Sequence, residues 1–327
     1  MHTFDDFRGQ SAHIGQLHAD FAQGTNVHAY LFSGPKGTGK RSVARLCAMT
    51  ALCRGENKPC GVCGPCRRML GGTHPDVHDV VPEKDKKSIG VDVIRTAIEE
   101  VGVKSFEGGA KAVIFPEAER MTPAAQNCLL KTLEEPPQGT VFFLITDQPA
   151  ALLPTIVSRC RMVRFHPLSQ EAAAARLAAL GLSDEDARRR ARIAEGCVGQ
   201  ALAIGEEQMN LRRSLSQAVF SVRGPGDVFA VVNAYKDDKE RQTQVMDALE
   251  CMIRDILAAQ AGGMPLDGAG YAPQAEAYAA KAPMKSGLVL QREVLRARRM
   301  LGSNVSFASA LESILLKVSE EYHTWSW

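Results

Sequence analysis

The chain of 327 residues lacks the long apolar runs that mark membrane proteins. No stretch approaches the roughly 18 to 20 apolar residues that a helix needs to cross a bilayer. Residues 1–6 also lack the basic and then apolar order of a secretion signal. We therefore expect a cytoplasmic protein that has no membrane partner.

A strong excess of one charge is missing as well. The sequence has 39 Lys and Arg residues against 37 Asp and Glu residues, which gives a net charge of +2. Proteins that work alone on a phosphate backbone usually carry a pronounced basic excess or patch. The charge balance argues against a stand-alone DNA-binding protein, and we expect any contact with DNA to be local or shared with partners.

Internal repeats and low-complexity tracts are also missing, and the composition is that of a soluble globular protein with two or three domains. Short apolar segments alternate with helix-compatible segments in residues 1–166, which predicts a parallel sheet covered by helices. The predicted strands are 29–32, 77–81, 112–115, 141–145 and 162–165. From residue 167 onward the sequence has helical periodicity. The predicted fold class is α/β followed by all-α, with domains at 1–166, 167–207 and 208–327.

Cysteines are present but unevenly spread, since four of the nine fall within fourteen residues. In a reducing compartment such a cluster indicates a metal site and not disulfides. Four cysteine ligands around Zn²⁺ give a closed tetrahedral site that is structural and has no position for a catalytic water. The alternatives are an iron–sulfur cluster, which the spacing allows, and free thiols, which this density of cysteines disfavours. The predicted ligands are Cys53, Cys60, Cys63 and Cys66.

Residues 34–40, Gly-Pro-Lys-Gly-Thr-Gly-Lys, have the spacing of a phosphate-binding loop. An apolar run at 29–32 precedes them and a helix-compatible segment follows, which is the strand, loop and helix context that this motif requires. In such a loop the backbone amides hold phosphates and the lysine meets the outer phosphates. The candidate nucleotide-binding residues are Gly34, Gly37, Thr38, Gly39 and Lys40.

Two residues that the chemistry of this loop needs are missing. Arg41 stands where a Ser or Thr hydroxyl would bind Mg²⁺. Pro116 stands where the strand at 112–115 should end in a metal-binding aspartate, which leaves Glu117 alone. Together these losses argue against Mg²⁺ binding and ATP hydrolysis. Binding of ATP without hydrolysis stays open, because Lys40 and the loop amides are kept.

Arg159 lies in a Ser-Arg-Cys segment that leads into the last predicted strand. An arginine displayed beside a nucleotide fold can neutralise a phosphoryl group that a neighbouring subunit holds. The alternative is a surface arginine that pairs with a carboxylate, and the spacing alone favours this simpler interpretation.

Several motifs together indicate a family. They are His-Pro-Asp at 74–76, Ile-Gly-Val-Asp-Val-Ile-Arg at 89–95, Asn-Cys-Leu-Leu-Lys-Thr-Leu-Glu-Glu-Pro-Pro at 127–137 and Ser-Arg-Cys at 158–160. As a set they resemble the bacterial DNA polymerase III clamp loader subunits of the AAA+ class. The resemblance implies a RecA-like domain at 1–166 with a zinc module inserted at about 53–66, a helical lid at 167–207 and a C-terminal helical collar at 208–327.

Two kinds of subunit share these motifs: the gamma or tau ATPase, and the delta-prime subunit, whose nucleotide machinery is usually defective. Arg41 and Pro116 depart from the ATPase pattern, and Gly199 stands where the ATPases present a phosphate-sensing arginine. The chain therefore resembles the delta-prime subunits. The resemblance implies that Arg159 acts in trans as an arginine finger on an adjacent ATPase subunit.

We expect a subunit that joins gamma/tau-type ATPase subunits and a delta-type subunit to load the sliding clamp onto primed DNA during DNA replication. It would belong to the DNA polymerase III holoenzyme without hydrolysing ATP itself. One alternative is a gamma/tau-type ATPase, which ATP turnover abolished by Lys40→Ala would indicate. The other is a zinc-containing DNA-binding protein that acts alone, which a salt-dependent DNA affinity of the isolated chain would indicate.

Overall fold

The computed structural model describes residues 3–10, 12–24, 27–84, 86–107, 109–262, 273–301 and 305–325. The chain divides into two compact units. The first holds residues 1–172 and 197–200, and the second holds residues 173–196 and 201–327. The further division of the helical part into a lid and a collar stays a prediction.

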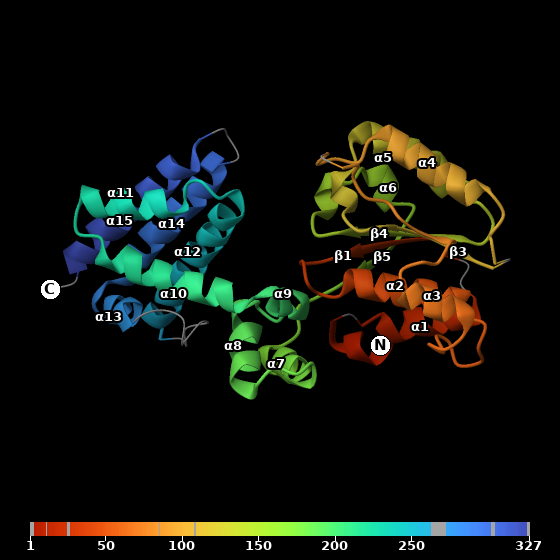
Figure 1. The fold of residues 1–327 in the computed structure, drawn as a ribbon, viewed down its shortest axis with the longest axis horizontal. Coiled ribbons are helices and arrows are strands. Elements are labelled where there is room, and N and C mark those ends of the chain that lie inside the picture. Colours follow the sequence, from red (N-terminus) through yellow and green to blue (C-terminus); the bar gives the residue numbers. More distant parts are fainter. Residues whose placement is uncertain are drawn as a thin grey trace. The chain divides into compact units, whose positions relative to one another are not determined.

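The first unit is built on a parallel sheet of five strands in the order β2-β3-β4-β1-β5 (Figure 1). The strands are β1 (Ala29–Ser33), β2 (Val77–Asp79), β3 (Lys111–Phe115), β4 (Thr140–Thr146) and β5 (Arg161–Arg164). All residues of β1, β3 and β4 are buried, as expected for strands that helices cover on both faces. The strands predicted from the sequence are confirmed.

Helices cover both faces of the sheet (Figure 1). One face carries α1 (Ile14–Gln23), α2 (Lys40–Leu52) and α3 (Gly64–Leu70), and the other carries α4 (Val91–Gly102), α5 (Pro123–Glu134) and α6 (Pro154–Val157). Side chains alternate along β1 because successive strand residues point to opposite faces. Tyr30 and Phe32 therefore pack in the core under α1 and α2, whereas Leu31 packs in the core under α4, α5 and α6.

The start of α5 shows how local sequence sets an element. Thr122 has extended backbone dihedrals and its hydroxyl accepts a hydrogen bond from the Ala125 amide at 3.2 Å, while Pro123 occupies the first turn. Leu129 and Leu133 then follow at helical spacing and are buried against the sheet. The helix is fixed at both its start and its apolar face.

Residues beyond 167 are helical wherever the structure describes a regular element, as the periodicity predicts. The helices are α7 (Gln170–Ala179), α8 (Asp184–Ile193), α9 (Val198–Ala203), α10 (Glu206–Ser221), α11 (Pro225–Tyr235), α12 (Lys239–Gln260), α13 (Pro273–Lys281), α14 (Met284–Leu301) and α15 (Phe307–Trp325). In the second unit, α10 to α15 share one core in which Leu249, Ile253 and Leu311 are buried. None of the helices described here combines the length and apolar character that a bilayer crossing needs.

Candidate functional site

The phosphate-binding loop (residues 34–40) connects β1 to α2, at the carboxyl edge of the sheet. Gly34, Gly37 and Gly39 have φ values of 145°, 77° and 83°, in the region that side chains disfavour. A Cβ on Gly34 would lie 2.2 Å from the Phe165 carbonyl oxygen. Glycine at these positions is therefore required by the backbone, and the predicted residues come together in one loop.

The Lys40 ammonium group forms hydrogen bonds with the backbone of its own loop. Its Nζ donates to the carbonyl oxygens of Gly34 at 2.5 Å and Pro35 at 2.7 Å. The Thr38 hydroxyl also donates to the Pro35 carbonyl, at 2.8 Å. Burial lowers the pKa of Lys40, and the negative charge of the nearby Asp147 opposes that shift. The lysine that would meet phosphates is thus satisfied by backbone oxygens of its own loop.

Arg41 forms an ion pair with Asp79. Its guanidinium donates to Asp79 Oδ2 at 2.7 Å, and Arg45, one turn further along α2, pairs with the same oxygen at 3.3 Å. Asp79 ends β2, so this ion pair joins the first turns of α2 to the sheet. Arg41 provides a guanidinium where a magnesium site would need a hydroxyl.

The carboxylates near the loop differ from those that the sequence suggested. Glu117, the candidate that follows Pro116, pairs with Arg120 at 3.1 Å on the surface. Glu119 is instead half-buried beside Asp147, and burial raises its pKa. Thr146, at the end of β4, accepts a hydrogen bond from the Gln148 amide at 2.9 Å. Glu119, two residues beyond Glu117, therefore joins Asp147 in placing negative charge near Lys40.

The segment Cys197–Gln200 packs directly on the phosphate-binding loop. The Gly199 amide donates to the Gly37 carbonyl at 2.8 Å, and Gln200 Nε2 donates to the Lys36 carbonyl at 3.0 Å. A Cβ on Gly199 would lie 2.9 Å from Gly37 Cα. Gly199 stands where the related ATPases present an arginine, and the absence of a side chain at this position permits the contact.

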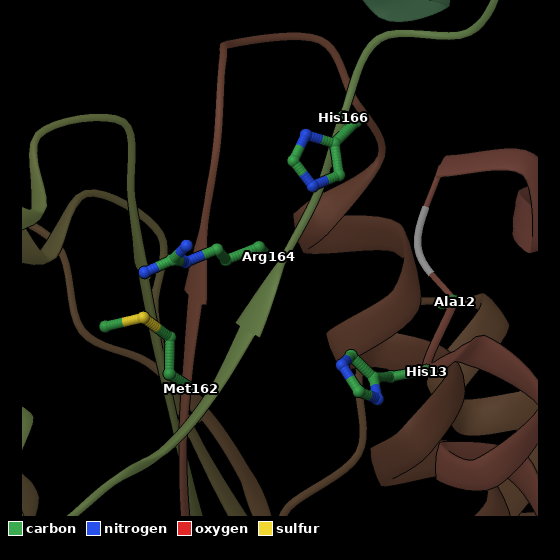
Figure 2. A pocket seen from close by; sticks show the side chains of 5 residues that line it. All are labelled: Ala12, His13, Met162, Arg164 and His166. Atoms are coloured by element: carbon green, nitrogen blue, oxygen red, sulfur yellow. The ribbon is translucent and has the colours of Figure 1, made fainter.

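A cavity of about 420 Å³ lies along β5, beside the start of the loop. Figure 2 shows Met162, Arg164 and His166 along β5 and the residues after it, with Ala12 and His13 across from them. An adjoining cavity of similar size shares the three β5-side residues and reaches Ser33, Gly34 and Pro35. Arg164 supplies a guanidinium to both cavities, and Asp147 supplies a carboxylate to the adjoining one.

The four clustered cysteines bring their sulfurs together, as predicted. All four Sγ atoms lie within 4.8 Å of one another, with Cys60 and Cys66 at 3.9 Å and Cys53 and Cys63 at 4.0 Å. A tetrahedral zinc site with bonds of about 2.3 Å places its sulfurs about 3.8 Å apart. The sulfur positions therefore fit a four-cysteine metal site, and none of the nine cysteines forms a disulfide.

Backbone amides support the cysteine cluster from outside. The amides of Gly55 and Cys60 both donate to Cys53 Sγ at 3.3 Å, and the Cys63 amide donates to Cys60 Sγ at 3.4 Å. Hydrogen bonds from the Cys63 and Val62 amides lower the pKa of Cys60 to about 6. For Cys60 the donors favour the thiolate, the protonation state that metal binding requires, whereas burial raises the pKa of Cys66.

Arg159 follows α6 and precedes β5. Its guanidinium pairs with Glu134 at the end of α5 and donates to the Thr155 carbonyl at 2.9 Å, while 34% of the side chain stays exposed. In a parallel sheet the start of β5 and the end of β1 lie at opposite edges, about 17 Å apart for a five-residue strand. Arg159 and the phosphate-binding loop of the same chain are therefore not brought together.

Comparison with known proteins identifies the family. A family model described as "DNA polymerase III, delta subunit" matches residues 9–169. DNA polymerase III subunit delta' of Escherichia coli K12 is 35% identical over 245 residues, covering 72% of this chain and 73% of the relative. The same subunit of Bacillus subtilis 168 is 33% identical over 302 residues, covering 90% and 91%. This chain belongs to the delta-prime family of DNA polymerase III subunits.

The resemblance predicted from the motifs is confirmed. The delta-prime chain is also 33% identical to subunit tau of Escherichia coli K12 over 240 residues, which cover 69% of this chain and 36% of tau. The two delta-prime relatives named above match over 73% and 91% of their own length, whereas this subunit tau matches over 36% of its own.

Sequence reasoning missed the structural roles of two buried polar residues, Gln126 and Asp76. Gln126 of α5 donates to the carbonyls of Met121 and Ala151, both at 3.2 Å, and accepts from the Leu153 amide at 2.7 Å. It thereby fixes the segment that leads into α6 and Arg159. Asp76 holds the loop after α4 through three hydrogen bonds. Gln126 could have been found from the sequence, because it is a polar residue on the face of α5 that the leucine spacing predicts to be buried.

Proposed function

We propose that this delta-prime chain is a non-hydrolysing subunit of a clamp loader. It assembles with gamma/tau-type ATPase subunits and a delta-type subunit, and the complex places the sliding clamp on primed DNA during replication. The main support comes from the phosphate-binding loop, where Lys40 donates to loop carbonyls and Arg41 is paired with Asp79.

The loss of hydrolysis follows from the chemistry of the missing groups. Phosphoryl transfer needs Mg²⁺ to neutralise charge on the phosphates and a carboxylate to orient the attacking water. Arg41 offers a cation where a hydroxyl should hold Mg²⁺, and Pro116 offers no carboxylate at the end of β3. These features support a chain that keeps the phosphate-binding fold but does not hydrolyse ATP.

Arg159 would act on the nucleotide of an adjacent subunit. Its position at the amino edge of the sheet separates it from its own phosphate-binding loop, so only a neighbour's nucleotide can use it. Glu134 and the Thr155 carbonyl fix the direction of the guanidinium, and its exposed third leaves donors for a phosphoryl oxygen. An arginine that is held in advance loses less entropy when it engages its target.

The cysteine cluster would hold a structural Zn²⁺. Cys53 follows α2 and Cys66 lies in α3, so the ion would tie these two helices together through thiolates that are all supplied by one short segment. Four protein ligands close the coordination sphere, and the ion would therefore contribute stability and no catalysis.

A reconstituted clamp loader tests the role of Arg159. Arg159→Ala should leave assembly intact and reduce hydrolysis at the adjacent site by about a thousandfold, which is seen as a partial loss of total DNA-stimulated ATPase and of clamp loading. Arg161→Ala is the matched control, since Arg161 is 38% exposed and also pairs with a carboxylate, Asp20, at 2.8 Å. Equal rates for the two variants would contradict the proposal.

The gamma/tau-type ATPase is the second candidate, supported by the identity to tau and by the retained Lys40. Purified chain with ATP, Mg²⁺ and DNA distinguishes the two. The proposed role predicts no turnover, and turnover that Lys40→Ala abolishes would establish the ATPase instead.

A further inference from the structure

The segment between α4 and β3 displays an aromatic side chain. Among the exposed large hydrophobic residues that the structure describes, Phe106 has the largest exposed fraction, 83%, and Val103 of the same segment is 68% exposed. Single exposed apolar residues are ordinary on protein surfaces. The way the backbone of this segment is held sets Phe106 apart.

Asp76 fixes the backbone on both sides of the Phe106 side chain. This carboxylate is only 2% exposed and accepts from the Phe106 amide at 2.7 Å, the Glu107 amide at 3.1 Å and the Ser105 hydroxyl at 3.1 Å. The buried Lys111 ammonium donates to the Val103 carbonyl and, at 2.9 Å, to the Glu100 carbonyl. Residues 103–107, the 103–107 loop, are therefore held by two buried charged groups.

Two arginines close to the cysteine cluster, Arg54 and Arg68, also hold the 103–107 loop and bring positive charge to it. Arg54 donates to the Glu107 carbonyl at 2.9 Å and pairs with the Glu107 carboxylate at 3.3 Å, and Arg68 pairs with that carboxylate too. Burial lowers the pKa of His74, 3.9 Å from Glu107, so the imidazole adds no charge at neutral pH. The cationic groups around the loop are Arg54, Arg68, the exposed Lys104 and the buried Lys111, and the carboxylates that face them are Glu107 and Asp76. Four cations against two carboxylates leave an excess of positive charge among these residues beside Phe106.

We propose that the 103–107 loop, with Arg54 and Arg68, is a docking surface for a protein partner that offers an apolar pocket bordered by carboxylates. Phe106 would fill the pocket, and the basic groups would face the acidic border. Because the loop is already ordered, little conformational entropy is lost when the aromatic ring is buried. The loop precedes β3, at the amino edge of the sheet, so this surface is separate from the phosphate-binding loop.

Site-specific photocrosslinking in cells tests the proposal with the full-length chain. A benzophenone amino acid replaces Phe106 in one strain and Phe229 in another, because Phe229 is also a strongly exposed phenylalanine, at 69%, and lies in α11. The protein captured at 106 is then purified, and its affinity is measured for the unmodified chain and for variants.

We expect Phe106→Ala to weaken binding of that purified protein about 30-fold and Phe229→Ala to leave it unchanged. Lys104→Glu should weaken it several-fold at low salt and less at high salt, because the attraction to the acidic border is screened. Melting temperature checks the fold of each variant, and Lys104→Glu keeps the test valid if Phe106→Ala does not fold. The proposal is overturned by a capture no greater at 106 than at 229, by capture of a second copy of this chain or of nucleic acid, or by equal affinities of the Phe106→Ala and unmodified chains.

Discussion

Gly199→Ala should release the Cys197–Gln200 segment from the phosphate-binding loop. The added Cβ would lie 2.9 Å from Gly37 Cα and 3.0 Å from the Gly37 carbonyl oxygen, both shorter than the 3.4 Å at which ordinary contact begins. Backbone atoms form the obstacle, so a change of side-chain rotamer cannot relieve the clash. The segment has to move away from the loop.

The magnitude follows from the hydrogen bonds that this movement breaks. These are the 2.8 Å bond from the Gly199 amide to Gly37 and the 3.0 Å bond from Gln200 to Lys36. At about 1 kcal/mol each, their loss lowers the free energy of opening the segment by about 2 kcal/mol. The open population then rises about 30-fold.

Native-state hydrogen exchange measures this change directly. In the Gly199→Ala variant the backbone amides of residues 197–200 should exchange about 30-fold faster than in the unmodified chain. The amides of the sheet should keep their protection. Gly15→Ala is the matched control, because the same atom is added within the same unit and meets nothing within 4 Å. If the two variants exchange alike in residues 197–200, the contact does not hold the segment and the reasoning is refuted.

The metal site and α5 give the remaining predictions. Elemental analysis should find one zinc ion per chain, lost in Cys66→Ser together with a lower melting temperature but kept in Cys251→Ser, whose sulfur lies outside the cluster; iron in place of zinc would contradict this assignment. Gln126→Leu should reduce the free energy of unfolding by about 3 kcal/mol in urea titration, because three backbone groups lose their partner. Gln16→Leu should change the free energy of unfolding far less, because the exposed Gln16 amide donates, among the residues that the structure describes, only to Asp20 Oδ1, at 2.6 Å; equal losses would show that burial of the Gln126 bonds adds nothing.

Features with a local signature could be predicted from the sequence. The strands are short apolar runs buried on both faces, and the cysteines are ligands within one short segment whose spacing already limits how far apart the sulfurs can lie. Glycines that need positive φ in the phosphate-binding loop also show in the sequence, since the motif itself requires them. Each of these depends on residues near one another in the chain.

Contacts set by the sheet could not be predicted in this way. Arg41 and Asp79 are 38 residues apart and meet because β2 ends near the first turn of α2. Asp76 reaches Phe106 because β2 pairs with β3 and so brings the loop before β3 beside the residue before β2. Glu119, and not Glu117, approaches Lys40 because the short helix at Ala118–Arg120 turns the chain after β3. Strand order and register decide the first two contacts, and neither can be read from local spacing.

Restoring any one of the groups missing at the phosphate-binding loop would leave the other departures in place, and Arg159 does not depend on any of them. A hydroxyl at position 41 would leave Pro116 without a carboxylate, and a carboxylate there would leave Lys40 bonded to its own loop and Gly199 packed on Gly37. Arg159 depends on Glu134, Thr155 and the segment that Gln126 fixes, all of which lie away from that loop. A chain built this way can lose its own hydrolysis without disturbing the arginine, and the role proposed for it requires both.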